Sequence, residues 1–141
     1  MGAGSDNPRP SDFAKLTKEK VRFSDTDRLG HVNNTVFARY FESGRVDILY
    51  DNGVKRTPEG TFFVAAHTSI DFLLEVNWPS EVVVATKVEK IGRSSVTFSQ
   101  ALFVNDACTT KAKAVIVMMD EETRRSAELP PSLRAFFEAL Q

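Results

Sequence analysis

Residues 22–50 of this chain read RFSDTDRLGHVNNTVFARYFESGRVDILY, and this stretch decides the fold. It combines the end of a strand, an acidic turn from Asp25 to His31, and a long amphipathic helix that opens at Asn33-Asn34. A carboxylate therefore lies a few residues ahead of a helix N-terminus, where unpaired N–H groups carry partial positive charge. Such a pairing can direct a base or a nucleophile at a carbonyl that backbone N–H groups polarise.

The helix is predicted by its periodicity. Asn33 is a good N-cap, because its side chain can accept from an N–H of the first turn. Asp51-Asn52-Gly53 ends the helix, which gives about 17 residues and roughly 25 Å of length. Gly44 costs roughly 1 kcal/mol of helix propensity relative to Ala, and we interpret it as a close approach to a flat partner such as a sheet. The apolar face holds Val36, Phe37, Tyr40, Phe41, Gly44, Ile48 and Leu49, and the polar face holds Arg39, Glu42, Ser43, Arg45 and Asp47.

The rest of the chain is predicted to be mainly β-structure, from alternating apolar residues. Four consecutive strands with short turns predict an antiparallel meander, and the apolar stripe of the helix must be covered by that sheet. The fold class is therefore α+β, a hotdog fold in which a curved antiparallel sheet of about five strands wraps around one long central helix. The expected elements are a first strand at Leu16–Phe23, strands at Thr61–Leu74, Glu81–Lys90, Ser95–Val104 and Thr110–Met119, and a last helix capped by Ser132 and running through Ala139.

Composition sets the remaining limits. The chain has 141 residues, 42% of them hydrophobic and 11 of them Phe, which suits one globular domain with a sizeable core. We expect a disordered leader at residues 1–12 and a single domain at residues 13–141. The net charge of −1 is made of mixed signs and argues against nucleic acid or an anionic membrane as partner. The single Cys108 and the lack of any apolar run near ~20 residues favour a cytoplasmic protein. With two His and no CxxC or HExxH pattern, no metal and no cofactor are expected.

The run from Val21 to Asn34, with its D-x-D-x-x-G-H-V-N-N pattern, resembles the signature of hotdog-fold acyl-CoA thioesterases. The nearest branch is the 4-hydroxybenzoyl-CoA thioesterase-like one, and the Gly-His-Val-Asn-Asn run is also similar to bacterial long-chain acyl-CoA thioesterases and plant acyl-ACP thioesterases. The resemblance covers roughly residues 17–137. It continues through Phe37, Tyr40, Phe41, Glu42 and Arg45, the turn at residues 90–95, and the Leu129-Pro130-Pro131 exit.

This resemblance implies that the chain hydrolyses a thioester of CoA, or of acyl carrier protein, to a free acid. Asp27 would be the catalytic carboxylate, either attacking the carbonyl or activating a water. A backbone N–H near Asn34 would bind the oxyanion, and His31 would complete the catalytic group. Some relatives carry His or Tyr where Asn34 stands, and an amide is not a strong base. The resemblance further gives Asn33, Tyr40, Ser94 and Ser95 as substrate-binding residues. It also implies a homodimer or homotetramer with active sites at the seam between two sheets.

Each of these residues also has a simpler interpretation. Asp25 and Asp27 could satisfy backbone N–H groups in a turn, and we keep that interpretation for Asp25. His31 could orient Asp27, line the pocket or pack at the turn. Glu42 and Arg45 are three apart and favour an ion pair on the helix, with Glu42 as the alternative catalytic carboxylate. The remaining simpler interpretations are a helix cap for Asn33, a polar turn for Ser94 and Ser95, and a structural or interfacial place for His67.

Two other functions stay open. The first is a hotdog hydratase or dehydratase, although the Asp-x-Asn-Pro-x-His type of run that those relatives carry is missing. The second is a non-catalytic acyl-CoA-binding protein. The acyl group is also open, because Phe37, Phe62, Phe63 and Phe72 as pocket-lining candidates would suit aromatic and aliphatic chains equally.

Overall fold

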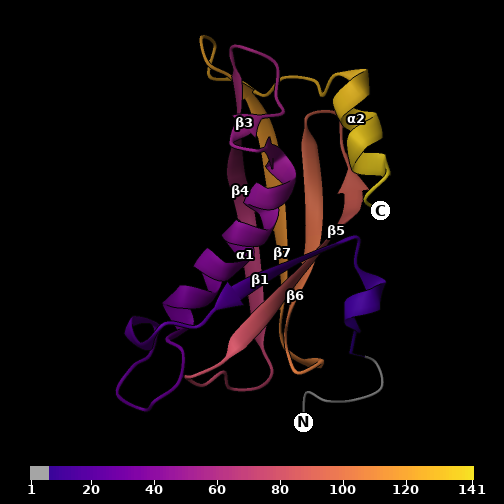
Figure 1. Cartoon of the computed structure of the whole chain (residues 1–141). Coiled ribbons are helices and arrows are strands. Elements are labelled where there is room, and N and C mark those ends of the chain that lie inside the picture. Colours follow the sequence, from indigo (N-terminus) through magenta and orange to yellow (C-terminus); the bar gives the residue numbers. More distant parts are fainter. Residues whose placement is uncertain (1–6) are drawn as a thin grey trace.

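In the computed structural model, which describes residues 7–141, one long helix lies against a five-stranded antiparallel sheet (Figure 1). The helix is α1 (Asn34–Leu49), and the strand order in the sheet is β1-β5-β6-β7-β4. This is the predicted hotdog arrangement. The sheet strands are β1 (Lys15–Lys20), β4 (Thr61–Phe72), β5 (Glu81–Ile91), β6 (Ser95–Val104) and β7 (Ala107–Asp120). The smaller elements are β2 (Tyr50–Asp51), β3 (Val54–Lys55), α2 (Pro131–Glu138) and the 3₁₀ turns η1 (Pro10–Asp12) and η2 (Phe23–Asp25).

Helix α1 confirms the prediction from periodicity. The Asn33 side chain accepts from the Thr35 N–H at 3.0 Å, as an N-cap does. Gly44 meets the sheet so closely that a Cβ there would lie 2.7 Å from Val84 Cγ1. The missing side chain therefore sets how near the helix can lie to β5, as its place in the apolar stripe indicated.

Arg45 is where the helix prediction was wrong. We expected it on the polar face in an ion pair with Glu42, but Arg45 is buried and donates to the Gln100 side chain at 3.1 Å. Gln100, on β6, also donates to the Phe41 carbonyl and to the Thr86 hydroxyl, each at 2.9 Å. Arg45 thus joins a buried polar network between helix and sheet. Burial lowers the pKa of its guanidinium, and the nearby Glu42 charge partly offsets that effect.

The predicted meander of four consecutive strands was also wrong. Only β5, β6 and β7 follow one another in the sheet; β4 pairs with β7 at one edge, and β1 pairs with β5 at the other. The physical reason is the connection between β4 and β5, residues 73–80, which is longer than hairpin loops usually are. It passes across the end of the sheet and contacts the loop before α1, where Val32 N–H donates to the Val76 carbonyl at 2.8 Å.

Strand β4 contains a bulge between Ala65 and His67. One extra residue reverses which face later side chains occupy. Phe63 packs against the core before the bulge and Ile70 packs against it after the bulge, although the two positions differ by an odd number of residues. A single period of two over Thr61–Leu74 therefore could not describe the strand.

Several boundaries differ from the prediction. The first strand ends at Lys20, so Phe23 lies in η2 with 71% of its surface exposed. Asn52 and Gly53 both have positive φ and form the turn of the small β2–β3 hairpin. The sequence analysis expected this pair only to end the helix. The last helix begins at Pro131 with Pro130 as N-cap, so Ser132 does not cap it. Of the expected leader, residues 1–6 lie outside the described residues, and Pro10–Asp12 forms a 3₁₀ turn.

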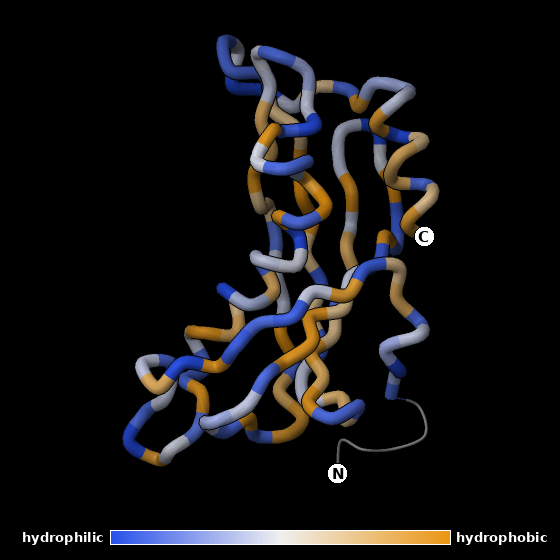
Figure 2. Tube along the Cα trace, in the orientation of Figure 1, coloured by the Kyte–Doolittle hydropathy of each residue, from blue (hydrophilic) through white to orange (hydrophobic). Residues whose placement is uncertain are grey.

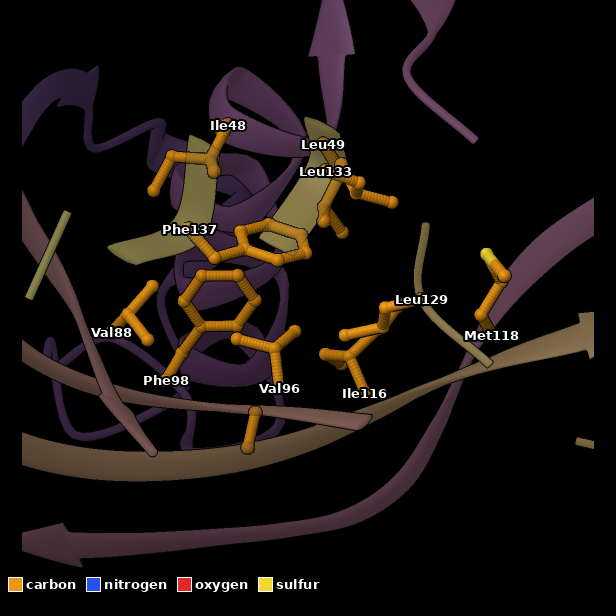
Figure 3. Packing of buried hydrophobic residues seen from close by; sticks show 11 residues of the cluster. Ile48, Leu49, Val88, Val96, Phe98, Ile116, Met118, Leu129, Leu133 and Phe137 are labelled. Atoms are coloured by element: carbon orange, nitrogen blue, oxygen red, sulfur yellow. The ribbon is translucent and has the colours of Figure 1, made fainter. Parts of the chain in front are cut away.

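Two clusters of buried side chains fill the space between the helices and the sheet, in keeping with the alternation of apolar and polar segments along the chain in Figure 2. Figure 3 shows the cluster beneath α2, where the Phe98 and Phe137 rings meet edge to face at 6.1 Å. The second cluster lies under the first turns of α1 and holds Val21, Val32, Phe37, Phe41 and Val76 among others. It supports the loop before α1. Within residues 7–141, no helix combines the length and the apolar character that crossing a membrane requires.

Candidate active site

Asp25 connects the acidic turn to helix α1 through hydrogen bonds. Its carboxylate is buried and accepts from the Arg22 N–H at 2.9 Å, from the Tyr40 hydroxyl at 2.7 Å, and from the Arg39 guanidinium. Its carbonyl accepts from the Asn33 N–H at 2.9 Å. All of these bonds stay within the protein, so Asp25 holds the loop in place, as the simpler interpretation had it.

The contacts of Asp25 set its charge state. Burial by itself raises the pKa of this carboxyl, but the hydrogen bonds from Tyr40, the Arg22 N–H and Arg39 together hold it below its usual range. Burial, and then the bond to Asp25, raise the pKa of the Tyr40 phenol. At neutral pH the pair is therefore a carboxylate and a neutral phenol.

We expect Asp25→Asn to destabilise the fold by about 2 kcal/mol at pH 7, because it removes charge-assisted hydrogen bonds. A carboxyl with a lowered pKa stabilises the folded state above the unfolded pKa of about 4, and this contribution is lost as the pH falls. The variant should therefore lose less stability than the wild type between pH 5 and pH 3, a range of about 2 pH units. Urea unfolding at several pH values measures both effects. Equal stability of Asp25→Asn and the wild type at pH 7 would refute the role of Asp25 in holding the loop.

Asp27 lies two residues further on, in a different setting. Its side chain is exposed in the single chain, and one carboxylate oxygen, Oδ1, accepts from the Leu29 N–H at 2.9 Å. The turn closes through the Gly30 N–H to the Asp27 carbonyl at 3.1 Å, and Gly30 has a φ of 81°. Within residues 7–141 the other oxygen, Oδ2, accepts no hydrogen bond. Asp27 is thus both a turn former and a carboxylate with one oxygen available.

The start of α1 offers an unpaired backbone donor. The Thr35 N–H is taken by the Asn33 side chain, and the Val36 N–H donates to the Asn33 carbonyl at 2.9 Å. The Asn34 N–H donates to no acceptor within the described part of the chain. Because the helix dipole places partial positive charge at this end, Asn34 N–H is suited to bind an anionic oxygen.

Asp27 and the first residues of α1 line the same pocket, which has a volume of about 400 Å³. The connection between β4 and β5 forms the opposite wall, and Phe37 of α1 meets Phe72 of β4 edge to face at 5.2 Å. The pocket is therefore polar near the helix start and apolar near these rings. Its polar residues are Asp27, His31, Asn33, Asn34 and Glu75, and its apolar residues are Leu29, Val32, Phe37, Phe72, Leu73, Leu74 and Val76.

The other predicted site residues lie elsewhere. The Tyr40 hydroxyl is bound to Asp25 and is not in the pocket. Ser94 and Ser95 lie at the β5–β6 turn. On the shared neighbour β7, Ser95 pairs with Val117, whereas the pocket residue Phe72 pairs with Thr110. The turn is therefore roughly 23 Å along β7 from the Phe72 side of the pocket. Glu42 is exposed on α1, roughly 12 Å along the helix from its start.

Further predicted side chains also lie away from the pocket. Phe63 packs on the core and Phe62 lies against Arg124, so of the four candidate Phe residues only Phe37 and Phe72 line it. His67 is exposed on β4. Among residues 7–141, no three His, Cys, Asp or Glu side chains gather in a way that would hold a metal ion.

Glu75 is the charged pocket residue that the sequence analysis missed. Its carboxylate lies 3.0 Å from Nε2 of His31. It stands between the strands predicted at Thr61–Leu74 and Glu81–Lys90, and no periodicity indicated the direction of its side chain. The only available signal was the long β4–β5 connection, which is unusual for a hairpin.

Comparison with known proteins identifies the class. A family model described as the thioesterase-like superfamily matches residues 21–137. The chain belongs to this superfamily and is a thioester hydrolase. Its structure superposes on a thioesterase from Thermus thermophilus, crystallised with coenzyme A and Zn, with a TM-score of 0.78 and 31% identity over 90% of this chain and 94% of that one.

Two curated relatives agree with this assignment. One is the acyl-CoA thioesterase YbgC of Haemophilus influenzae, 24% identical over 86% of this chain and 93% of that protein. The other is the chloroplastic acyl-acyl carrier protein thioesterase ATL2 of Arabidopsis thaliana, 28% identical over 84% of this chain and 65% of that protein. Both likenesses confirm the hotdog thioesterase resemblance inferred from the D-x-D-x-x-G-H-V-N-N run.

Proposed function

We propose that the chain hydrolyses an acyl thioester of CoA, or of acyl carrier protein, with Asp27 as the reacting carboxylate. One arrangement carries this proposal: an available Asp27 oxygen and the unpaired Asn34 N–H line one pocket. Thioester hydrolysis needs a nucleophile or base together with stabilisation of the carbonyl oxygen as it becomes anionic. The pocket supplies both within a few residues of sequence. The carriers named for the relatives, acyl-CoA and acyl carrier protein, support this substrate class.

The reaction can follow either of two routes from this pocket. In the first, Asp27 attacks the thioester carbonyl carbon and the C–S bond breaks, which leaves an acyl-aspartyl anhydride and a thiolate; water then hydrolyses the anhydride. In the second, Asp27 takes a proton from a water that attacks the same carbon, and the thiolate leaves. In both routes the Asn34 N–H donates to the carbonyl oxygen as negative charge develops there. A thiolate is a good enough leaving group to depart without a proton donor.

The remaining candidates take supporting places in this proposal. His31 contacts substrate or water at the pocket wall, and Asn33 acts mainly through its cap, since its side-chain oxygen is bound to Thr35. Tyr40 contributes through Asp25. Glu42 stays the alternative carboxylate, because it is exposed on the same helix. We also keep the cytoplasm as the proposed compartment, on composition alone.

A thiol-release screen tests the activity. The purified protein is incubated with acyl-CoA thioesters of increasing chain length and with aromatic ones, and free thiol is followed with a chromogenic disulfide. We expect turnover with at least one acyl class. Hydration of an enoyl-CoA without thiol release would support a hydratase instead. Tight calorimetric binding without turnover would support a non-catalytic binding protein.

The edges of the sheet favour a dimer through β4. Isolated edge strands present unpaired backbone groups, and proteins commonly protect them with Lys. The edge strand β1 carries three Lys in six residues, whereas β4 carries none in twelve. Residues 64–69 of β4 are all exposed in the single chain. We therefore propose that two copies pair along β4 into one continuous sheet.

This pairing would also bring Ser94 and Ser95 nearer a pocket. Two antiparallel copies of β4 set the Thr61 end of one beside the Phe72 end of the other. Because Phe72 lines the pocket, and the β5–β6 turn lies toward the Thr61 end of the sheet, the partner's turn would approach this pocket. A homodimer is then the smallest complete unit, and a homotetramer would need a second interface.

We expect Ala66→Lys, at the β4 bulge, to shift the sedimenting mass from dimer to monomer and to lower activity with it. The matched control is Leu16→Lys on β1, where the chain already places Lys at neighbouring positions, and it should leave mass and activity unchanged. Analytical ultracentrifugation at assay concentration measures the mass. A fully active wild-type monomer would contradict the proposal, as would dissociation caused by the β1 change alone.

A further inference from the structure

His31 and Glu75 are in contact within the pocket, and the proposed mechanism leaves this contact unexplained. Nε2 of His31 lies 3.0 Å from Oε2 of Glu75, and the two side chains are 33% and 66% exposed. Exposed ion pairs contribute little to stability, typically about 0–1 kcal/mol. This pair differs from the other surface pairs in its place, because both side chains line the pocket that also holds Asp27.

The backbone around the pair is fixed on both sides. His31 forms a β-bridge with Asn77, and Val32 N–H donates to the Val76 carbonyl at 2.8 Å. Val32 and Val76 are both buried, at 3% and 2% exposure. Since side chains alternate between the two faces of a ladder, the buried valines direct His31 and Glu75 to the opposite face, toward each other. The pairing is therefore a consequence of the fold.

The contact favours one state of the imidazole. A carboxylate oxygen accepts hydrogen bonds and cannot donate them, so the Nε2 that lies 3.0 Å from Glu75 is the ring nitrogen suited to carry the hydrogen. In the neutral ring, Nδ1 is then the acceptor. The contact with Glu75 is made by Nε2, which leaves Nδ1 on the other side of the ring. An acceptor held at the pocket wall can bind the hydrogen of a water molecule and orient it.

We propose that Glu75 is a positioning residue: it fixes the orientation and tautomer of His31, and His31 Nδ1 orients the water that hydrolysis consumes. This inference rests on the proposed thioesterase function. It applies to both routes, because water attacks directly in one and attacks the acyl-aspartyl anhydride in the other. Glu75 acts through His31 and does not itself touch the reacting atoms.

The first test reads the imidazole without any activity. The chain has two His, so ¹⁵N labelling of histidine gives two ring spectra, and His67→Asn assigns them. At about pH 8.5 an ordinary imidazole is neutral, and we expect His31 to show the Nε2–H tautomer. Glu75→Ala should change this to a mixture of tautomers, whereas Glu75→Gln, which keeps an acceptor oxygen, should preserve the Nε2–H form. An unchanged His31 spectrum in Glu75→Ala would overturn the proposal.

The second test separates positioning from a merely structural role. Glu75→Ala should lower kcat by about tenfold to a hundredfold with KM within about twofold, as expected when an imidazole loses the partner that orients it. Glu75→Gln should recover most of that loss. In a His31→Ala background the same Glu75→Ala change should have almost no further effect, because Glu75 acts through His31.

A matched control comes from the Lys113–Glu89 pair, which is 3.1 Å long and lies outside the pocket. Glu89→Ala should leave kcat and the His31 spectrum unchanged. If Glu89→Ala and Glu75→Ala have the same kinetic effect, the role assigned to Glu75 is refuted. If the wild type shows no thiol release at all, the proposed function fails, and the NMR experiment still decides whether Glu75 fixes His31.

Discussion

Asp27→Asn is expected to lower kcat for thiol release by about 10²- to 10⁴-fold, the usual range for loss of a group that performs proton transfer. The melting temperature should stay within about 1 °C of the wild type, because Asp27 is exposed and exposed substitutions that keep the local contacts have small effects. Asn keeps an oxygen that can accept from the Leu29 N–H, so the turn through Gly30 should persist. Steady-state kinetics and a thermal melt on the same sample measure both effects.

The control for this experiment is the Asp25→Asn variant, two residues away in the sequence. Asp25→Asn removes a carboxylate from the same loop, but from a buried position bonded to Arg22, Arg39 and Tyr40, so it should mainly lower stability. If Asp27→Asn retains wild-type kcat, Asp27 is not the reacting carboxylate. Glu42→Gln then becomes the decisive variant, and a large loss of kcat there would place the chemistry on the helix surface.

Gly44→Val is expected to destabilise the fold by about 3 kcal/mol, which corresponds to roughly 10 °C in melting temperature for a domain of this size. A Cβ at this position would lie 2.7 Å from Val84 Cγ1, 3.0 Å from the Thr86 hydroxyl oxygen and 3.1 Å from Gln100 Nε2. Val84 is fully buried, and Thr86 and Gln100 are bonded to each other. The sheet therefore has little freedom to make room.

Ala38→Val on the exposed face of α1 gives the matched comparison. It introduces the same β-branched side chain into the same helix, so it should cost only the difference in helix propensity, about 0.5 kcal/mol. Chemical denaturation of the two variants separates propensity from contact with the sheet. Equal stability of Gly44→Val and Ala38→Val would mean that the helix does not press on β5 at this point.

The features that sequence could predict are those set by local physics. The cap at Asn33, the apolar stripe of α1 and the role of Gly44 follow from helix geometry and were confirmed. The hotdog fold followed from one long helix followed by several strands. The D-x-D-x-x-G-H-V-N-N run gave the family, which the comparisons confirm, and the roles of its individual residues stay predictions.

The features that sequence could not predict depend on contacts between distant segments. Whether β4 lies beside β5 or beside β7 is decided by the path of residues 73–80 across the end of the sheet. The bulge beside Ala65 reverses the faces of β4 without any change in its alternating pattern. Arg45 looked exposed because its partner, Gln100, lies 55 residues away. Glu75 reaches the pocket for the same reason, through a backbone pairing of residues 31–32 with residues 76–77.

The central claim is that a thioester carbonyl binds where Asp27 faces the start of α1. A non-hydrolysable acyl-CoA in which a methylene group replaces the sulfur keeps the carbonyl and cannot release a thiol. Titrated into ¹⁵N-labelled protein, this ketone should shift the Asn34 backbone amide resonance, together with those of residues 27–31, at concentrations that inhibit turnover. Saturating ligand that leaves the Asn34 amide unshifted and perturbs only residues outside the pocket would contradict the claim.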